Sequence, residues 1–93
     1  QRVPQVATAV RVTSPPRALV SALSDELAAR QAALGDDGRA VLRPSGTEPV
    51  VRVMAEAPTT EAAQAVVDEL SRLVTERDAA TGELVQPAND GGD

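Results

Sequence analysis

The chain has 93 residues, the size of one small domain, and it contains neither cysteine nor histidine. The missing cysteines exclude disulfides and thiolate metal sites, and the missing histidines remove the commonest general base and metal ligand. Its net charge is −5 and every basic residue is an arginine, a balance that argues against non-specific nucleic-acid binding.

The chain has no Phe, Trp or Tyr and one Met, so its core must be built from Val, Leu and Ala. No apolar run approaches the ~20 residues that span a membrane, and the N-terminus lacks the pattern of a secretion signal. We therefore expect no membrane partner and a cytoplasmic location. Because the chain begins with Gln1 rather than Met, we also expect it to be part of something longer.

The first predicted elements are a strand and a helix. Apolar residues alternate over residues 6–12, which indicates a strand with one buried face. Ser14-Pro15-Pro16 ends that strand, and residues 17–34 then show a helical stripe of Leu and Ala. Gly35 is well placed just beyond the end of this helix. Asp36-Asp37-Gly38 reads as a turn, because the spaced acidic ligands of a calcium loop are missing.

The second half contains two strands and a second helix. We predict strands over residues 39–43 and 50–55, joined by a loop with two prolines and one glycine over residues 44–49. A helix with a Thr cap opens within residues 58–61 and keeps its apolar period to about Arg77.

The order of these elements predicts an α+β fold, β-α-β-β-α, with a small sheet and both helices on one face. We place the folded domain at residues 1–78. Residues 79–93 are small, polar and Gly-rich, and we expect a disordered tail there.

The loop between the second and third strands concentrates groups that bind an oxyanion. Ser45 and Thr47 supply hydroxyl donors, and Gly46 permits a turn in which successive amides converge on a ligand. Arg43 ends the incoming strand with a planar fork of donors, and Arg52 on the outgoing strand is a second candidate. A plain hairpin connection with solvated arginines is the alternative reading, and Glu48 fits either an arginine partner or an exposed carboxylate. The loop is not a P-loop, because neither a Lys nor a helix follows the glycine.

The stretch GRAVLRPSGTEPVVRVMAE, residues 38–56, resembles the C-terminal domain of the bacterial phosphoglucosamine mutase family within the α-D-phosphohexomutase superfamily. The resemblance covers roughly residues 3–77 and follows the predicted order of elements. It implies a TATA-box-binding-protein-like fold, and an enzyme of four domains that interconverts glucosamine 6-phosphate and glucosamine 1-phosphate. A phosphoserine in the first domain, Mg²⁺ held by the second and sugar recognition by the third are also implied.

Carried over by position, the resemblance makes Arg43, Ser45, Gly46, Thr47 and Arg52 the clamp for the substrate phosphate that is not transferred. The phosphoserine segment, the acidic metal loop and the sugar-recognition loop are not in this sequence. We therefore expect no catalytic residue, no metal and no cofactor in this domain, Mg²⁺ belonging to the complete enzyme, and no mutase activity from this chain alone. Its expected partners are a phosphosugar and the other domains of the enzyme. The C-terminal domain of a phosphomannomutase or phosphoglucomutase, or a non-catalytic protein-interaction domain, remains open.

Overall fold

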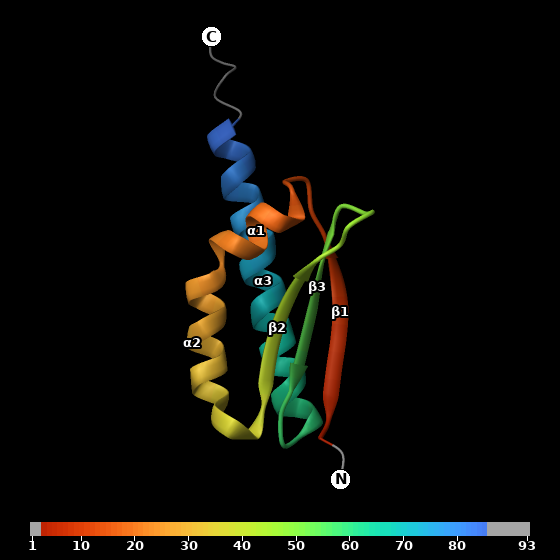
Figure 1. Cartoon of the computed structure of the whole chain (residues 1–93), viewed down its shortest axis with the longest axis vertical. Helices are drawn as coiled ribbons and strands as arrows, with labels where there is room; N and C mark the ends of the chain where they lie inside the picture. The colour runs from red at the N-terminus through yellow and green to blue at the C-terminus, as the bar shows by residue number, and fades with distance from the viewer. Residues whose placement is uncertain (1–2, 86–93) are drawn as a thin grey trace.

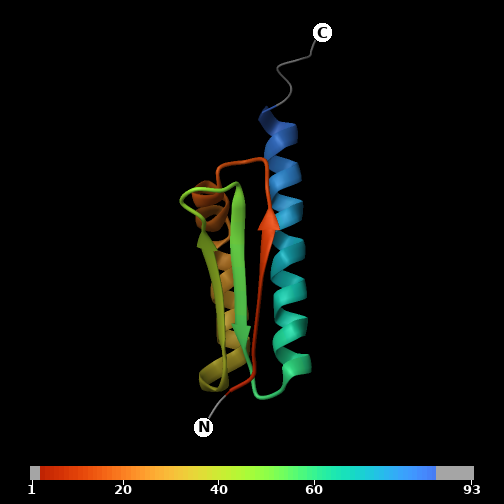
Figure 2. The same ribbon diagram turned by 90° about the vertical axis from the view of Figure 1, so that its right-hand side faces the viewer.

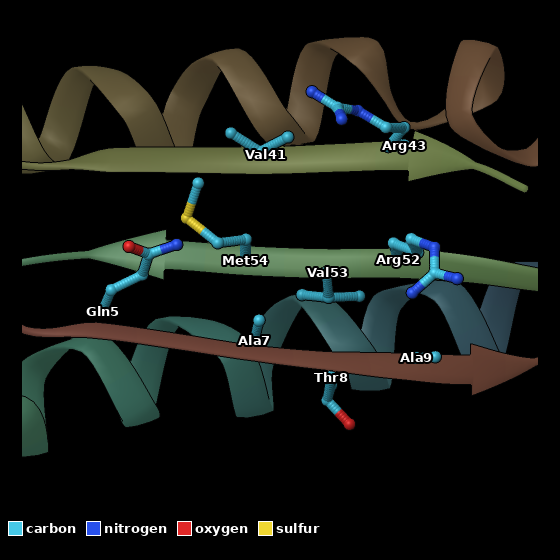
Figure 3. Close-up of a pocket in the computed structure, with 9 residues that line it drawn as sticks. All are labelled: Gln5, Ala7, Thr8, Ala9, Val41, Arg43, Arg52, Val53 and Met54. Atoms are coloured by element: carbon cyan, nitrogen blue, oxygen red, sulfur yellow. The ribbon is translucent and has the colours of Figure 1, made fainter.

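The computed structural model describes residues 3–85. Its elements run in the order β1 (Gln5–Arg11), α1 (Pro16–Ala22), α2 (Ser24–Leu34), the 3₁₀ turn η1 (Gly35–Asp37), β2 (Arg39–Pro44), β3 (Val50–Glu56) and α3 (Thr60–Val85). The strands form one antiparallel sheet in the order β1-β3-β2. Figures 1 and 3 show the helices behind one face of this sheet. The predicted α+β class and the single covered face are confirmed.

Alternation along the central strand separates a covered face from an open one. Val51, Val53 and Ala55 have no exposed surface and point toward the helices, whereas Arg52, Met54 and Glu56 point to the open side. The same alternation holds in β2, where Ala40 and Leu42 are buried. Because successive side chains of a strand point to opposite faces, the buried positions also determine which residues reach the open face.

The core is made without a single aromatic ring, as the composition requires. Its fully buried larger side chains come from α1, β3 and α3, and they are Leu19, Leu70, Val51, Val53, Val67 and Val74. Each contributes on the order of 1.5–3 kcal/mol through burial of its apolar surface. The amphipathic period of α3 predicts its three members correctly.

The helix predicted over residues 17–34 is two helices. The chain bends at Leu23, whose φ and ψ are −99° and 11°, and α2 begins again at Ser24. No proline or glycine marks this bend. The Leu23 side chain is 2% exposed, so packing of this residue into the core accompanies the change of direction. The apolar pattern with a period of 3.6 residues does not reveal a bend at a single residue, because the apolar stripe continues on both sides of it.

The predicted end of the last helix near Arg77 is also wrong. α3 continues to Val85, and Figure 2 shows it running beyond the end of the sheet. Residues 79–83 are small or polar in sequence and do not extend the apolar stripe, and they continue a helix that packing has already nucleated. The remaining residues of the expected tail, 86–93, lie outside the described residues. At its other end α3 has the predicted cap, because the Thr59 hydroxyl oxygen accepts a hydrogen bond from the Ala62 amide at 3.0 Å.

The turn before β2 depends on two glycines. Gly35 has φ of 65°, a backbone conformation that side chains disfavour, and this confirms its predicted place beyond the end of α2. Gly38 is needed for a different reason. A Cβ atom there would lie 2.4 Å from the carbonyl oxygen of Glu56, so the close approach of β2 and β3 excludes any larger residue.

Candidate functional site

The loop over residues 45–49 lies at the same end of the sheet as the connection between β1 and α1 (Figures 1 and 2). The two segments are joined directly, because the Val12 amide donates a hydrogen bond of 2.8 Å to the Pro49 carbonyl oxygen. Pro44 and Pro49 restrict the backbone at both ends of the loop. The loop is therefore held in place at one end by a neighbour that is far away in sequence.

Within the loop, the Ser45 hydroxyl organises the backbone. Its oxygen accepts hydrogen bonds from the amides of Thr47 at 3.3 Å and Glu48 at 3.1 Å, while the Ser45 amide donates to the Val50 carbonyl oxygen at 3.1 Å. The expected convergence of successive amides on a ligand is therefore not formed. A short hydroxyl side chain competes for nearby amides and here satisfies two of them. The hydrogen of the Ser45 hydroxyl group remains available for donation to an acceptor outside the loop. The two hydrogen bonds that its oxygen accepts from amides polarise the group and strengthen such a donation.

Gly46 stands at the tip of this loop with open space around it. Nothing lies within 4 Å of the position that a Cβ atom would occupy, and its φ is not positive. The glycine is therefore required neither by its backbone conformation nor by its neighbours in the chain. No hydrogen bond within residues 3–85 uses the Gly46 amide, which leaves this donor for an external acceptor.

Arg43 and Arg52 are directly paired across β2 and β3 on the open face. Like charges directly opposite one another destabilise a sheet. In Figure 3 the two guanidinium groups point apart, that of Arg52 toward Ala9 on β1. Neither arginine forms an ion pair with an acid in the part of the chain that the structure describes. The pair is therefore an unneutralised positive site, which is the arrangement expected of a binding site for an anion.

A shallow groove of about 430 Å³ lies on the open face next to this pair. Its floor is apolar, with small residues on β1 and larger ones on β2 and β3: Ala7, Ala9, Val41 and Met54. Arg43 and Arg52 line one end and Gln5 lines the other (Figure 3). The groove thus joins an apolar floor to a cationic end.

The structure brings the five predicted site residues to one end of the sheet. Ser45 is half-buried, whereas Arg43, Thr47 and Arg52 are exposed and accessible to a ligand. Glu48 is exposed too, with no ion pair in the described residues, in keeping with the exposed-carboxylate reading. Sequence reasoning missed Arg11, which pairs with Val50 at the loop end of β1 and alternates onto the same face as Ala9. The alternation of residues along this strand already indicated that the Arg11 side chain points to the open face.

Neither a metal site nor a membrane span is found in the described part of the chain. Its acidic side chains nowhere gather in threes, so residues 3–85 offer no set of ligands for Mg²⁺. None of the helices in this range combines the length and apolarity needed to cross a bilayer.

Known relatives match this chain over most of its length. The profile of the family described as "Phosphoglucomutase/phosphomannomutase, C-terminal domain" matches residues 8–73. The phosphoglucosamine mutase of Thermobifida fusca is 49% identical over 74 residues, and that of Oceanobacillus iheyensis is 47% identical over 72 residues. These alignments cover 78% and 76% of this chain but 16% of each relative. The chain thus spans about one sixth of the relatives' length.

Solved structures agree with the sequence matches. An N-acetylglucosamine-phosphate mutase of the α-D-phosphohexomutase superfamily, crystallised in its substrate complex, superimposes with a TM-score of 0.64 at 27% identity, over 81% of this chain and 16% of that one. An Aspergillus fumigatus N-acetylphosphoglucosamine mutase, in complex with GlcNAc-6P and magnesium, shares the fold with a TM-score of 0.68 at 23% identity, over 84% of this chain and 16% of that one. The chain belongs to the family of phosphoglucomutase/phosphomannomutase C-terminal domains.

Proposed function

We propose that this chain binds the phosphate of a hexose phosphate as the C-terminal domain of a cytoplasmic phosphoglucosamine mutase. In this proposal it holds the phosphate that is not transferred while glucosamine 6-phosphate and glucosamine 1-phosphate are interconverted. The carrying observation is that the Ser45–Thr47 loop adjoins Arg43 and Arg52, neither of which forms an ion pair within residues 3–85. The identities near 49% to phosphoglucosamine mutases favour this substrate class over the mannose and glucose phosphates that the family description names.

The domain contributes recognition of an anion. The Ser45 and Thr47 hydroxyls and the Gly46 amide donate hydrogen bonds to phosphate oxygens, and the two guanidinium groups neutralise the charge. Such a site recognises the phosphate and little of the sugar. It therefore accepts a substrate in either orientation, as a bisphosphorylated intermediate that turns over between two half-reactions requires. The described residues supply no ligand set for Mg²⁺, so no step of this proposal runs through a metal held by this chain.

A titration of the 93-residue chain with inorganic phosphate tests the proposal directly. We expect dissociation constants on the order of millimolar, because a single open anion site makes few contacts in water. Backbone amide shifts should move at Ser45, Gly46 and Thr47. Glucosamine 6-phosphate should produce the same pattern, and unphosphorylated glucosamine should produce none. Unchanged shifts with both phosphate ligands would remove the anion site.

Arg43 offers the sharpest variant. We expect Arg43→Ala to weaken phosphate binding more than tenfold, because hydrogen bonds to charged groups are worth about 1.5–3 kcal/mol. Arg43→Lys should recover part of the affinity, since an ammonium keeps the charge but loses the fork. Arg39→Ala is the matched control, because Arg39 is exposed on the same strand and pairs with Glu56. Equal affinities for the Arg43 and Arg39 variants would argue against this site.

A further inference from the structure

A carboxylate on α3 holds the turn that follows β1. The amides of Thr13 and Ser14 donate hydrogen bonds of 2.9 Å and 2.8 Å to the two different carboxylate oxygens of Asp78. The Thr13 hydroxyl donates to the same carboxylate at 3.2 Å and 3.3 Å. This contact joins residues 64 and 65 positions apart in sequence.

The two amides have no regular partner of their own. β1 ends at Arg11, and α1 begins at Pro16, directly after Pro15. The amides of residues 13 and 14 therefore belong neither to the sheet ladder nor to a helix, and unpaired buried amides are costly. Ser14 is 9% exposed, so its amide depends on the carboxylate rather than on water.

The next residue along the chain carries the contact to the loop. Val12, 4% exposed, donates its amide to the Pro49 carbonyl oxygen at 2.8 Å. Pro49 closes the loop that holds Ser45, Gly46 and Thr47. A continuous path of adjacent residues and hydrogen bonds thus runs from α3 through the turn to the phosphate loop.

We propose that Asp78 is a positioning residue for the phosphate loop, acting through the Thr13–Ser14 turn and the hydrogen bond from Val12 to Pro49. Its effect on the loop stands on the geometry alone, and only its effect on phosphate affinity rests on the proposed function. The pKa of Asp78 supports the proposal: burial, the largest single cause, raises it, but the hydrogen bonds from Thr13 and Ser14 together lower it below 3.8. The carboxylate is therefore ionised at neutral pH and accepts hydrogen bonds at both oxygens.

Hydrogen exchange on the 93-residue chain measures the effect on the loop. In Asp78→Asn we expect protection of the Val12 amide to fall on the order of tenfold, because a charge-assisted contact to the adjacent turn is lost. The Val53 amide at the centre of the sheet should lose clearly less. In the same variant, the dissociation constant of inorganic phosphate should rise roughly threefold. The Asp78→Glu variant keeps the charge and should recover part of both effects.

Asp68→Asn is the matched control. Asp68 is an exposed carboxylate on the same helix and accepts a hydrogen bond of 2.8 Å from Gln64. Removing it changes the net charge equally but should leave Val12 protection and phosphate affinity as in the unmodified chain. If Asp78→Asn does not fold, Thr13→Ala replaces it. That variant removes only the hydroxyl donor and should lower Val12 protection in the same direction by a smaller factor.

Three results would overturn the proposal. Unchanged Val12 protection in Asp78→Asn would show that the carboxylate does not hold the loop. Equal losses at Val12 and Val53 would show a general loss of stability instead of positioning. A loss confined to Val12 with unchanged phosphate affinity would show that the loop does not need the turn for binding. Absence of phosphate binding by the unmodified chain would instead defeat the proposed function, and Val12 protection would then decide the role of Asp78.

Discussion

Gly46, in the loop of the candidate site, and Gly35, in the turn before β2, are glycines for different reasons. Gly35 has a positive φ that a side chain opposes, whereas Gly46 has an ordinary φ and empty space around it. Folding therefore accounts for Gly35 but not for Gly46. In the proposed function, a phosphate that approaches the loop closely accounts for a glycine at this position.

This difference predicts opposite results for two alanine variants. Gly46→Ala should leave the free energy of unfolding unchanged or raise it by up to about 1 kcal/mol, because the unfolded chain loses freedom. Phosphate affinity should fall about tenfold as the methyl group occupies the approach to the amide. Gly35→Ala should lose about 1–2 kcal/mol of stability and keep its affinity. Urea unfolding and phosphate titration of both variants measure the two effects, and a phosphate affinity of Gly46→Ala equal to that of the unmodified chain would contradict this account.

At the scale of elements, the edge strand β2 is covered by a side chain of α2. The Gln31 side chain donates to the Gly38 carbonyl oxygen at 3.0 Å and accepts from the Ala40 amide at 2.9 Å. The amide group of this side chain thereby makes, at the outer edge of β2, one donor and one acceptor hydrogen bond of the kind that a neighbouring strand makes. Unpaired edge groups favour association with other chains, so this contact both orients α2 and protects the edge.

Gln31→Ala should therefore cost more than removal of an ordinary surface glutamine. We expect a loss of about 1–2 kcal/mol in the free energy of unfolding, because two half-buried backbone groups lose their partners. Gln64→Ala is the matched comparison, since the Gln64 amide group donates only to exposed Asp68 on the same helix. That change should stay within about 0.5 kcal/mol. Urea unfolding of both variants is the measurement, and similar midpoints would contradict the edge-pairing role.

Over the whole molecule, positive charge gathers on the sheet of an acidic chain. The strands carry Arg11, Arg39, Arg43 and Arg52 against one acid, Glu56, while the chain as a whole has a net charge of −5. Acidic side chains lie mainly on the helices and turns, away from the open face. The local field at the open face therefore differs in sign from the overall charge, and it attracts anions that the molecule as a whole repels.

Phosphate binding should consequently depend on ionic strength. Raising NaCl from about 50 mM to 500 mM should increase the dissociation constant several-fold, because screening over about 4–14 Å weakens the exposed charges. Arg52→Gln should flatten this dependence. Arg72→Gln changes the net charge equally, but Arg72 pairs with Glu76 on α3. This variant should therefore keep the salt dependence of the unmodified chain. Parallel salt curves for the two variants would show that net charge, and not the sheet face, governs binding.

Much of this organisation follows from local sequence. Period-two alternation predicted the first strand, and the apolar runs on either side of the Pro- and Gly-containing loop predicted the other two, all to within a residue or so. The stripe from Ala63 to Val74 predicted the covered face of α3. The Arg43–Arg52 segment also indicated the candidate site, because strand, loop and strand are contiguous and leave their side chains at one end of a hairpin. These features depend on neighbours within a few residues, which a sequence pattern records directly.

Only the tertiary structure decided the bend at Leu23, the continuation of α3 to Val85 and the contacts of Asp78. The bend and the Asp78 contacts depend on packing or hydrogen bonding between segments far apart in the chain, and such contacts leave no periodic signal. The end of α3 continues a helix that packing elsewhere has nucleated, so it needs no apolar stripe of its own. The hydrogen bonds of the Ser45 hydroxyl group are local in sequence, but the sequence did not predict them either. This oxygen accepts hydrogen bonds from amides that were expected to face a ligand, and that pairing depends on the closed geometry of the loop. The sequence alone thus determined the elements and the chemistry of the loop, while contacts between distant segments determined where the loop is held.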